Sequence, residues 1–517
     1  MLFEASGHGN KMIWQVIGIA LATAFLWRVL ASLKQVVSWR NAIKKLPTPS
    51  GAHWLFGHQK QRPFDPGFKW LLDTVKAFPR VYTVWLGPMP FPVLVHPETI
   101  KPLLTGAVAS EKSPMYELLA DWVGEGLATS KGAKWKRNRR LLTHSFHLDV
   151  LRTYSVAYND CVEVLLGKMD QLAVQGKPID VNHELVLATF DVILRTAFSY
   201  KSNCQLQELP KEDGLDVLSA CDTMTWFIQE RQFRNPFLLN PWIFRLSSDY
   251  PRYKKAFKYL RKLAKQIIED RTKEITAKME AGNPITKPRD FLDTLVMARD
   301  ADGKGFTMEE MSDEVNSFMF AGHETTATSM TWLLYNLAKY PEHQTKIREE
   351  VKEILTDRDT DRITSKDLSR MEYMTLVIKE SMRMMNAAPM ISRTVTVPYK
   401  VDDVTIPAGT MVFLCLHQLN HNPSVWGQDH MEFKPSRFLP ENLSQMDPFA
   451  YVPFSAGARN CIGQQFALNK IKVFVGRILM RFRLSLVDGE PKPVPQMNLV
   501  TKPVKPLYIA IEQIKGN

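Results

Sequence analysis

Cys461 stands in the segment Phe454-Ser-Ala-Gly457-Ala-Arg459-Asn-Cys461-Ile-Gly463, directly before a predicted helix. The start of a helix offers free backbone N–H donors and the positive end of the helix dipole, and both stabilise a thiolate. Gly457 permits a sharp bend, Gly463 lets the backbone approach another group closely, and Arg459 can neutralise a carboxylate. A free cysteine at a helix start is the alternative, but the complete pattern FxxGxRxCxG indicates a loop that presents a thiolate to an iron ion.

A second candidate site lies in the middle of a long predicted helix, in the run Ala321-Gly-His-Glu324-Thr325-Thr326. Adjacent threonines are unfavourable inside a helix, because a hydroxyl that bonds to a preceding carbonyl loosens the backbone ladder. A loosened turn beside a metal would admit dioxygen and water, and Glu324 and Thr325 could then relay protons. The alternative is a packed helix whose threonine pair has no chemical role. Together with the Cys461 loop, the run favours the proton relay.

A third group of residues has the charges needed to support the cysteine loop. Glu380 and Arg383 are three residues apart, so they share one face of a predicted helix. Arg437, in the run FKPSRF, could complete a buried triad with them. A Glu–Arg pair at this spacing is by itself a common surface feature. Its position upstream of FKPSRF and of the cysteine is what favours the supporting role.

The elements that must position these residues are mostly helical. Apolar residues recur at helical spacing and predict helices over 134–146, 152–172, 181–199, 250–281, 307–339, 341–356, 366–385 and 464–481. Short β-branched runs predict strands over 79–85, 92–95, 393–400 and 410–416. The proline-rich stretches 435–453 and 491–505 are expected to be ordered irregular chain. The expected fold is mainly α with a minor β region, as one large domain.

The N-terminal residues predict a membrane anchor. Residues 12–33 are apolar apart from Gln15 and Arg28, and as a helix they would span about 33 Å at about 1.5 Å per residue. A cleaved signal peptide is the alternative, but its cleavage tripeptides would lie inside the apolar run. We therefore expect an anchor over 1–33, a basic and proline-rich linker over 34–50, and the catalytic domain over 51–517. Basic residues on the C-terminal side of the anchor place that domain in the cytosol.

Charge and cysteine content exclude several other classes of protein. The net charge is +12, and residues 1–45 alone hold six Lys or Arg residues against one Glu. This distribution indicates a membrane-side flank and a docking face, and no motif supports nucleic-acid binding. The five cysteines are widely spaced, without the pairs that zinc sites or a disulfide framework would require.

These motifs, in this order, resemble the cytochrome P450 family from about residue 47 to the C-terminus. The resemblance is closest to the family 4 branch of long-chain fatty acid and eicosanoid hydroxylases. It rests on DWVGEGLATSKGAKWKRNRRLLTHSFH (121–147), FDVILRTAFSYKSNCQ (190–205), FMFAGHETT (318–326), LLYNLAKYPEHQ (333–344), HNPSVW (421–426) and PFSAGARNCIGQQFAL (453–468). The implied fold is a haem-thiolate monooxygenase domain, preceded here by the expected transmembrane helix.

The resemblance also implies a role for each site residue. Cys461 would be the axial ligand of the iron of haem b, within a loop that Phe454, Gly457 and Gly463 shape. Trp135 and Arg139 resemble the family's WxxxR element, which contacts a haem propionate, although alone they read as part of a basic amphipathic helix. The remaining roles are propionate contact by Arg393 and Arg459, support of the loop by Glu380, Arg383 and Arg437, and proton delivery by Glu324 and Thr325.

The implied reaction is insertion of one oxygen atom from dioxygen into a terminal or near-terminal C–H bond of a lipophilic substrate, such as a long-chain fatty acid or eicosanoid. The chain lacks flavin and nucleotide motifs, so electrons from NADPH must come through a separate flavoprotein reductase, with cytochrome b5 as a candidate second partner. The basic run 134–140 could dock the reductase, although such runs are usually only solvated. The implied location is the endoplasmic reticulum membrane, crossed once.

Three departures from the branch's pattern bear on the pocket. Ala321 stands where many members carry a glutamate that esterifies the haem, so the haem should be non-covalent apart from the Cys461–iron bond. Asn386-Ala387-Ala388 replaces a usual Pro-Pro segment, and Ala458 replaces a common proline. The pocket itself is expected near Trp122, Phe320, Met390 and Met497, for which core packing is the alternative.

Two other classes of function compete with the monooxygenase. A haem-binding sensor or carrier would keep Cys461 but needs no proton relay, so Glu324 and Thr325 argue against it. A membrane-anchored, non-catalytic partner would tolerate the loss of any motif, whereas all of them are intact.

Overall fold

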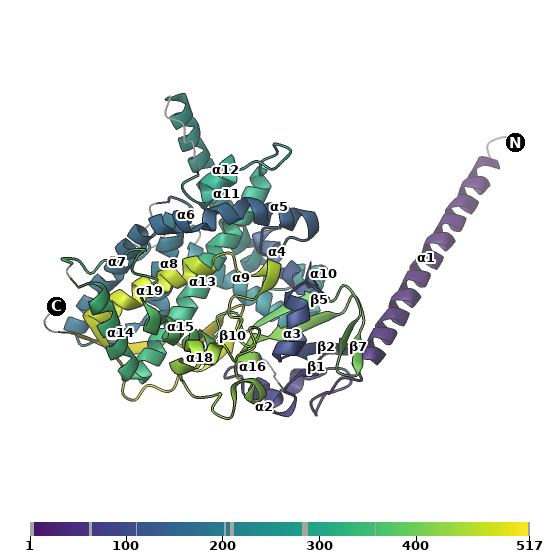
Figure 1. The fold of residues 1–517 in the computed structure, drawn as a ribbon. Coiled ribbons are helices and arrows are strands. Elements are labelled where there is room, and N and C mark those ends of the chain that lie inside the picture. Colours follow the sequence, from purple (N-terminus) through teal and green to yellow (C-terminus); the bar gives the residue numbers. More distant parts are fainter. Residues whose placement is uncertain are drawn as a thin grey trace.

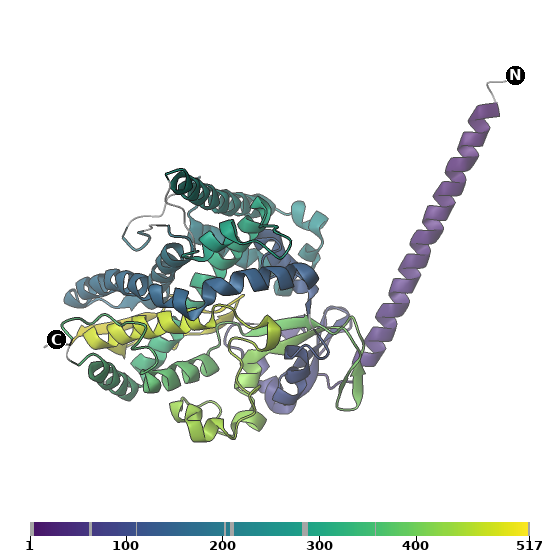
Figure 2. The ribbon, with the colours of Figure 1, turned by 45° about the horizontal axis from the view of Figure 1, so that its top comes forward.

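The computed structural model describes residues 5–61, 65–109, 111–200, 203–206, 211–212, 214–281, 288–356 and 358–514 of the 517 residues. Helices form most of the body, and a five-stranded sheet lies at the end of it from which the long N-terminal helix leaves (Figures 1 and 2). The predicted fold class, mainly α with a minor β region, is confirmed.

The helices cover the chain from end to end. They are α1 (Ala5–Ile43), α2 (Lys69–Ala77), α3 (Pro97–Leu104), α4 (Glu117–Val123), α5 (Gly132–Thr143), α6 (Leu148–Thr153), α7 (Ser155–Val174), α8 (Val181–Ala197), α9 (Val217–Gln229), α10 (Pro241–Arg245), α11 (Tyr250–Glu280), α12 (Phe291–Met297), α13 (Met308–Lys339), α14 (Pro341–Ile354), α15 (Glu372–Met384), α16 (Leu416–Asn420), α17 (Pro423–Trp426), α18 (Pro440–Leu443) and α19 (Gln464–Arg481).

The strands form one larger sheet and three small ones. They are β1 (Val81–Leu86), β2 (Met89–Leu94), β3 (Glu111–Lys112), β4 (Ile179–Asp180), β5 (Met390–Thr394), β6 (Tyr399–Val401), β7 (Val404–Ile406), β8 (Met411–Cys415), β9 (Phe482–Leu486), β10 (Pro495–Met497), β11 (Thr501–Pro503) and β12 (Tyr508–Gln513). The larger sheet has the order β1-β2-β8-β5-β3, in which only β2 and β8 pair in parallel.

Every predicted helix is present, with small differences at the ends. The helix expected over 366–385 begins only at Glu372, because Asp367 accepts hydrogen bonds from Thr364 and Arg358 and holds the preceding residues in turns. The strand expected over 393–400 is split into β5 and β6 around Pro398, which has no N–H to donate to a sheet. The stretch 491–505, expected to be irregular, contains the hairpin of β10 and β11.

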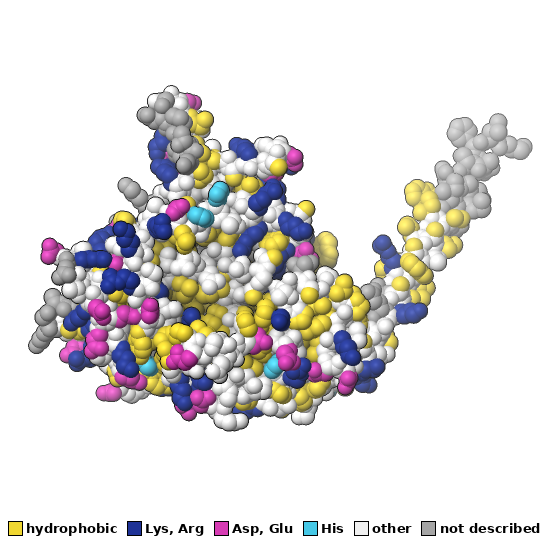
Figure 3. All heavy atoms as spheres, viewed as in Figure 1, with side chains coloured by type: hydrophobic (Ala, Val, Ile, Leu, Met, Phe, Trp, Pro, Cys, Tyr) yellow, Lys and Arg dark blue, Asp and Glu magenta, His cyan; other side chains and the backbone are white. Residues whose placement is uncertain are grey.

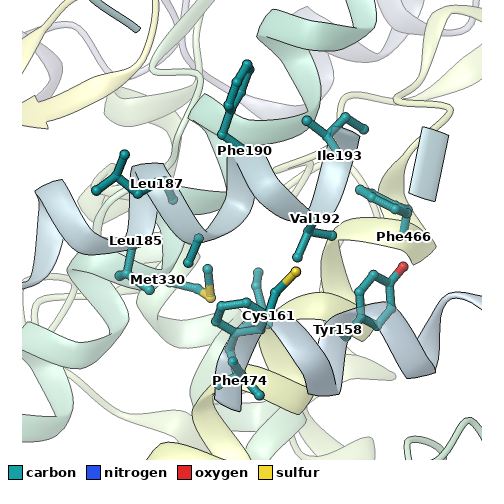
Figure 4. Packing of buried hydrophobic residues seen from close by; sticks show 14 of the residues in the cluster. Tyr158, Cys161, Leu185, Leu187, Phe190, Val192, Ile193, Met330, Phe466 and Phe474 are labelled. Carbon is teal, nitrogen blue, oxygen red and sulfur yellow. The ribbon is translucent and has the colours of Figure 1, made fainter. Parts of the chain in front are cut away.

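Helix α13 passes through the centre of the body and carries the predicted proton relay. Thr307 and Glu310 form a reciprocal capping box at its start, and Pro341 begins the next helix directly after it. It packs against α8, α11, α15 and α19. Figure 4 shows part of this core, where Cys161 of α7, Met330 of α13 and Phe474 of α19 pack together. Because α19 begins just after Cys461, the cysteine loop is mounted on the same core.

The N-terminal helix differs from its expected boundaries. It is helical as far as Ile43, so residues 34–43 are not a linker, and Figure 1 shows it leaving the body as one rod. Ile43 and Leu46 are buried against the larger sheet and its neighbour β7, so the domain begins before residue 51. The burial of these two apolar side chains places the start of the domain here, although the basic and proline-rich composition of the segment did not suggest it. Within the described part of the chain, no helix meets the length and mean hydropathy expected of a bilayer crossing.

Candidate haem-thiolate site

A cavity of about 270 Å³ lies where the cysteine loop, the middle of α13 and the chain after α15 meet. The predicted site residues that line it are Thr325, Arg393, Phe454, Arg459, Cys461 and Gly463. The others, Trp135, Arg139, Glu324, Glu380, Arg383, Arg437 and Gly457, lie outside its lining. A larger cavity of about 630 Å³ beside the C-terminal strands contains none of the predicted site residues.

The loop before α19 has the sharp bend that its glycine predicts. Gly457 has a φ of 69°, and a Cβ there would lie 2.0 Å from the carbonyl oxygen of Leu104. The backbone N–H of Cys461 donates to the carbonyl of Phe454 at 2.9 Å and closes the loop. At Gly463 a Cβ would lie 4.0 Å from the Cys461 sulfur, which is ordinary contact. A need for glycine at this second position would therefore come from a bound group.

Cys461 differs from the other cysteines in exposure and in electrostatic surroundings. It is exposed and lines the cavity, whereas Cys161, Cys204, Cys221 and Cys415 are buried. Burial raises the pKa of the thiols of Cys161 and Cys415 to about 12. Desolvation also raises the pKa of Cys461, but the N–H of Gly463 and nearby cationic side chains oppose that shift. Cys461 is thus the cysteine best placed to act as a thiolate in the cavity.

Trp135 and Arg139 of α5 contact the cysteine loop. Arg139 donates to the carbonyl oxygen and the side-chain oxygen of Asn460, at 2.9 and 2.7 Å. The guanidinium of Arg459 lies over the Trp135 ring, 3.9 Å from its centroid. Both residues thus fix the loop and orient Arg459, and their contact with a haem propionate stays a prediction.

Three cations converge on the cavity, and Arg459 among them is paired with Glu111 at 3.0 Å. Lys112 of β3, Arg393 of β5 and Arg459 of the loop all line it. Desolvation and its two cationic neighbours lower the pKa of Lys112 to about 7, and burial lowers the pKa of Arg459 to about 10 although Glu111 opposes that shift. Lys112 was not among the predicted residues. It is brought to Arg393 by the pairing of β3 with β5, a contact across 281 residues that no local motif signals.

Glu380, Arg383 and Arg437 form the predicted triad behind the cavity. The Glu380 and Arg383 side chains are 0% exposed and are joined by two hydrogen bonds, of 2.7 and 2.8 Å. Arg437 lies 3.5 Å from Glu380 and also bonds to the carbonyl of Asp429 at 2.6 Å. Arg383 further donates to the carbonyl oxygens of Asn420, His430 and Glu432. The triad therefore ties α15 to the long irregular segment that leads to the cysteine loop.

Thr325 and Glu324 point in different directions from α13. Thr325 lines the cavity, and its hydroxyl donates to the carbonyl of Ala321 at 2.8 Å, as expected for a loosened turn. Glu324 is 3% exposed and lies outside the lining, 2.5 Å from Lys502 and 3.3 Å from His323. Burial acts to raise the pKa of Glu324, but His323 and Lys502 outweigh it and bring the pKa to about 2. An ion pair therefore holds Glu324 beside the cavity lining, and the proton relay through Glu324 and Thr325 stays a prediction.

A second, apolar cavity of about 200 Å³ adjoins the first. The two share Tyr116, Ala388 and Ile391 in their linings. Phe320, Met390 and Met497 line the second cavity as predicted, and Trp122 packs edge-on against Phe320 at 5.1 Å between ring centroids. Among its described lining residues there is no Lys, Arg, Asp or Glu. The space beyond Cys461 therefore suits a hydrocarbon chain.

Comparison with known proteins shows the family of the chain. The family model for cytochrome P450 matches residues 47–510. The chain belongs to the cytochrome P450 family. A human ultra-long-chain fatty acid omega-hydroxylase is 36% identical over 91% of this chain and 89% of its own length. Rat cytochrome P450 4F1 is 34% identical over 94% and 93%, and mouse leukotriene-B4 omega-hydroxylase 3 is 33% identical over 97% and 96%.

A solved structure confirms the fold independently of close sequence similarity. The crystal structure of a cytochrome P450 (CYP102L1) superposes with a TM-score of 0.78 and covers 91% of this chain and 99% of its own. Its sequence is only 22% identical, so this similarity shows the fold alone.

The cofactor of this P450 is haem b, bound through a cysteine–iron bond, and the cavity fits that group. A thiol for the iron and cations for two propionates line the same space. The Nε atom of Arg459 is buried and has no hydrogen-bond partner among the described residues. An anionic group beside Lys112, Arg393 and Arg459 would satisfy that donor and offset the repulsion among the three cations.

Proposed function

We propose that this P450 hydroxylates a long-chain fatty acid or eicosanoid at or near its terminal carbon. The family is one of monooxygenases, and two of the relatives described above are a fatty acid and a leukotriene omega-hydroxylase by name. The observation that carries the substrate class is the apolar cavity lined by Phe320, Met390 and Met497, which adjoins the cavity of Cys461. A chain in that space would present its end toward Cys461.

The proposed cofactor contacts follow from the lining of the first cavity. Cys461 would bind the iron, and Lys112, Arg393 and Arg459 would pair with the propionates. Trp135 and Arg139 would hold Arg459 and the loop in place, and the Glu380 triad would support the same loop from behind. The bound haem supplies activation of dioxygen. The protein excludes water, orients the substrate and provides protons.

Proton supply is proposed to run through an ion-paired chain from the surface to Thr325. Lys502 of β11 bridges Glu324, at 2.5 Å, and Asp222 of α9, at 2.9 Å. Side-chain exposure falls along this chain, from 65% for Asp222 to 17% for Lys502 and 4% for Glu324. Glu324 would exchange a proton when the pair opens and pass it toward the Thr325 hydroxyl in the cavity. Lys502 thus positions the acid.

Replacing Lys502 with methionine tests this path. Without the ammonium group, only His323 would still oppose burial, so the pKa of Glu324 would rise and the carboxyl would lose one of its two fixed contacts. Because a positioned acid typically contributes a factor of 10² or more, the fraction of NADPH converted to product should fall about tenfold, with hydrogen peroxide released instead. Lys505→Met, a neighbouring exposed lysine, is the control. Unchanged coupling in Lys502→Met would show that Glu324 is not in the path.

The proposed electron donor is an NADPH-dependent flavoprotein reductase, with cytochrome b5 as a second donor. Much of the basic run on α5 is occupied within the chain, since Arg137 pairs with Asp300 and Lys134 with Glu125. Lys136 and Arg140 remain exposed, and neither has an acidic partner within the described part of the chain. These two cations would form the docking contact for an acidic reductase surface.

Attachment to the endoplasmic reticulum membrane by α1, with the catalytic body in the cytosol, is also proposed. Trp14, Ile19, Leu21, Phe25 and Trp27 of α1 are each more than half exposed, and Figure 3 shows apolar side chains along this helix. A second exposed apolar group lies near α10, at Phe237, Trp242, Ile243 and Leu246. A lipid surface would cover both.

A product screen tests the proposed function. The purified protein, with reductase and NADPH, should consume oxygen and convert fatty acids of varied chain length into terminal or near-terminal alcohols. Haem binding without NADPH-dependent oxygen consumption would instead indicate a sensor or carrier. Absence of any haem spectrum would indicate a non-catalytic partner.

A further test concerns covalent attachment of the haem. Ala321 lines the cavity one turn before Thr325, and its methyl group cannot form an ester. Denaturing chromatography in acid should therefore release free haem from the wild-type protein. Ala321→Glu places a carboxylate in the same cavity, and a fraction of its haem should stay attached after turnover, because the ester forms oxidatively. Haem that remains on the wild-type protein in acid would mean that another residue forms a bond.

A further inference from the structure

Asn386 has an unused hydrogen-bond donor at the cavity of Cys461. The residue is 2% exposed, and it lines the cavity together with Ala387 and Ala388. Its side-chain nitrogen Nδ2 has no partner among the described residues. Buried amide donors are normally paired, because an unpaired one has lost its hydration without replacement. We propose that Asn386 donates a hydrogen bond to a neutral oxygen of the substrate, and that the preferred substrates carry a hydroxyl or keto group near the oxidised carbon.

The backbone around Asn386 is held firmly, so its side chain has a defined direction. Thr501 of β11 donates its hydroxyl to the carbonyl of Asn386 at 2.7 Å and its N–H to the carbonyl of Ala387 at 3.0 Å. The carbonyl of Thr501 in turn accepts from the indole of Trp332 on α13 at 2.6 Å. The segment is therefore fastened both to the hairpin and to the central helix. A donor held in this way can select a ligand by position.

Two of the α13 hydroxyl groups that line the cavity are already bonded within the helix. Thr325 donates to the carbonyl of Ala321 at 2.8 Å, and Ser329 donates to the carbonyl of Thr325 at 2.9 Å. Ala387, Ala388 and Met382 add only apolar side chains to the lining. Asn386 therefore adds a buried, unpaired amide donor to a part of the lining that is otherwise mostly apolar.

The cofactor and a carboxylate head group are both poor partners for this amide. The hydrogen-bond acceptors at the periphery of haem b are its propionates, which Lys112, Arg393 and Arg459 would pair with. An ionised carboxylate needs more than one neutral donor to offset its burial. The partner that fits a single amide N–H in an apolar cavity is a hydroxyl, keto or epoxide oxygen.

The test uses binding of matched ligands to the haem-loaded protein, and it rests on the proposed function, since both need a hydrocarbon chain in this cavity. Palmitic acid is titrated against the series of its keto analogues with the carbonyl placed along the methyl half of the chain. Binding is read from the change in haem absorption. One or more keto positions should bind about tenfold tighter than palmitic acid, as expected for pairing a buried donor.

Two variants connect that preference to Asn386. Asn386→Leu removes the donor at similar volume, and Asn386→Asp replaces it with an acceptor, so both should abolish the preference for the keto chain. Thr410→Val is the control, because Thr410 is 1% exposed, its hydroxyl has no partner within the described residues, and it lines neither cavity. Its keto preference should equal that of the wild type. If Asn386→Leu does not fold, the keto preference of Asn386→Asp is used instead. If neither variant folds, the test is the affinity of the wild type for palmitic acid against its keto analogues.

The outcomes separate this inference from the proposed function. Equal affinity of the wild type for palmitic acid and every analogue would overturn the role of Asn386 and would mean that water satisfies the amide, while the proposed function stands. A keto preference that survives in either folded Asn386 variant would overturn it as well. A wild-type protein that binds none of these chains would overturn both proposals.

Discussion

Cys461→Ser is expected to abolish the thiolate-type absorption of the ferrous carbonyl complex and to reduce product formation to the background level. A serine hydroxyl keeps its proton at neutral pH, so the loop would present an uncharged oxygen where the proposed iron ligand has a charged sulfur. The change removes little volume from a residue that is exposed to the cavity. The fold should therefore persist, with a melting temperature close to that of the haem-free wild type.

A matched control separates ligation from a general effect of losing a thiol. Cys161→Ser makes the same chemical change at a buried residue of α7 that lines neither cavity. It should lower stability, because it buries a hydroxyl in the apolar core, and it should leave the carbonyl spectrum intact. A Cys461→Ser protein that retains the wild-type spectrum would show that the central assignment is wrong.

Glu380→Gln should be the most destabilising of the single changes considered. Glu380 and Arg383 are 0% exposed, and their pairing compensates two charges that have lost all contact with water. Removing one charge and keeping the other typically costs about 3–5 kcal/mol when the pair is buried. Because Arg437 is also within 3.5 Å, the variant would leave two guanidinium groups near a neutral amide. Loss of haem on purification and a lower denaturant midpoint should be measured together.

Glu441→Gln provides the comparison for that variant. Glu441 lies exposed in the first turn of α18, so its neutralisation should change stability by less than about 0.5 kcal/mol. If Glu380→Gln has the same midpoint and haem content as Glu441→Gln, the buried triad does not support the cysteine loop.

Local sequence patterns predicted the structural features that depend on residues close together in the chain. The helix ranges, the bend at Gly457 and the pairing of Glu380 with Arg383 each follow from spacings of a few residues. Contacts between distant segments could not be predicted in this way. Lys112 reaches Arg393 only through the pairing of β3 with β5, and Lys502 reaches Glu324 only because β11 packs near α13.

Two features depend on contacts that a single sequence does not display. Glu324 lies on a different side of α13 from Thr325, because consecutive helical residues point about 100° apart and the adjacent cation Lys502 holds the acid on its own side. The linker was expected to begin at residue 34, but the helix continues to Ile43, whose burial against the body stabilises the last turns. In both cases the deciding contact is made with a segment that is distant in the sequence.

The short strand β11 has a consequence for engineering this enzyme. Thr501 holds the chain at Asn386 and Ala387, and Lys502 holds Glu324. Two neighbouring residues of β11 therefore contact both the segment at which we propose that the substrate binds and the acid proposed to supply protons. Selection for altered regiochemistry that samples residues 495–503 would therefore also alter the efficiency of reductant use, and the two traits would not evolve separately there. Libraries that vary Asn386 or Met390 directly, with Thr501 and Lys502 held constant, should change the product pattern with a smaller loss in the fraction of NADPH converted to product.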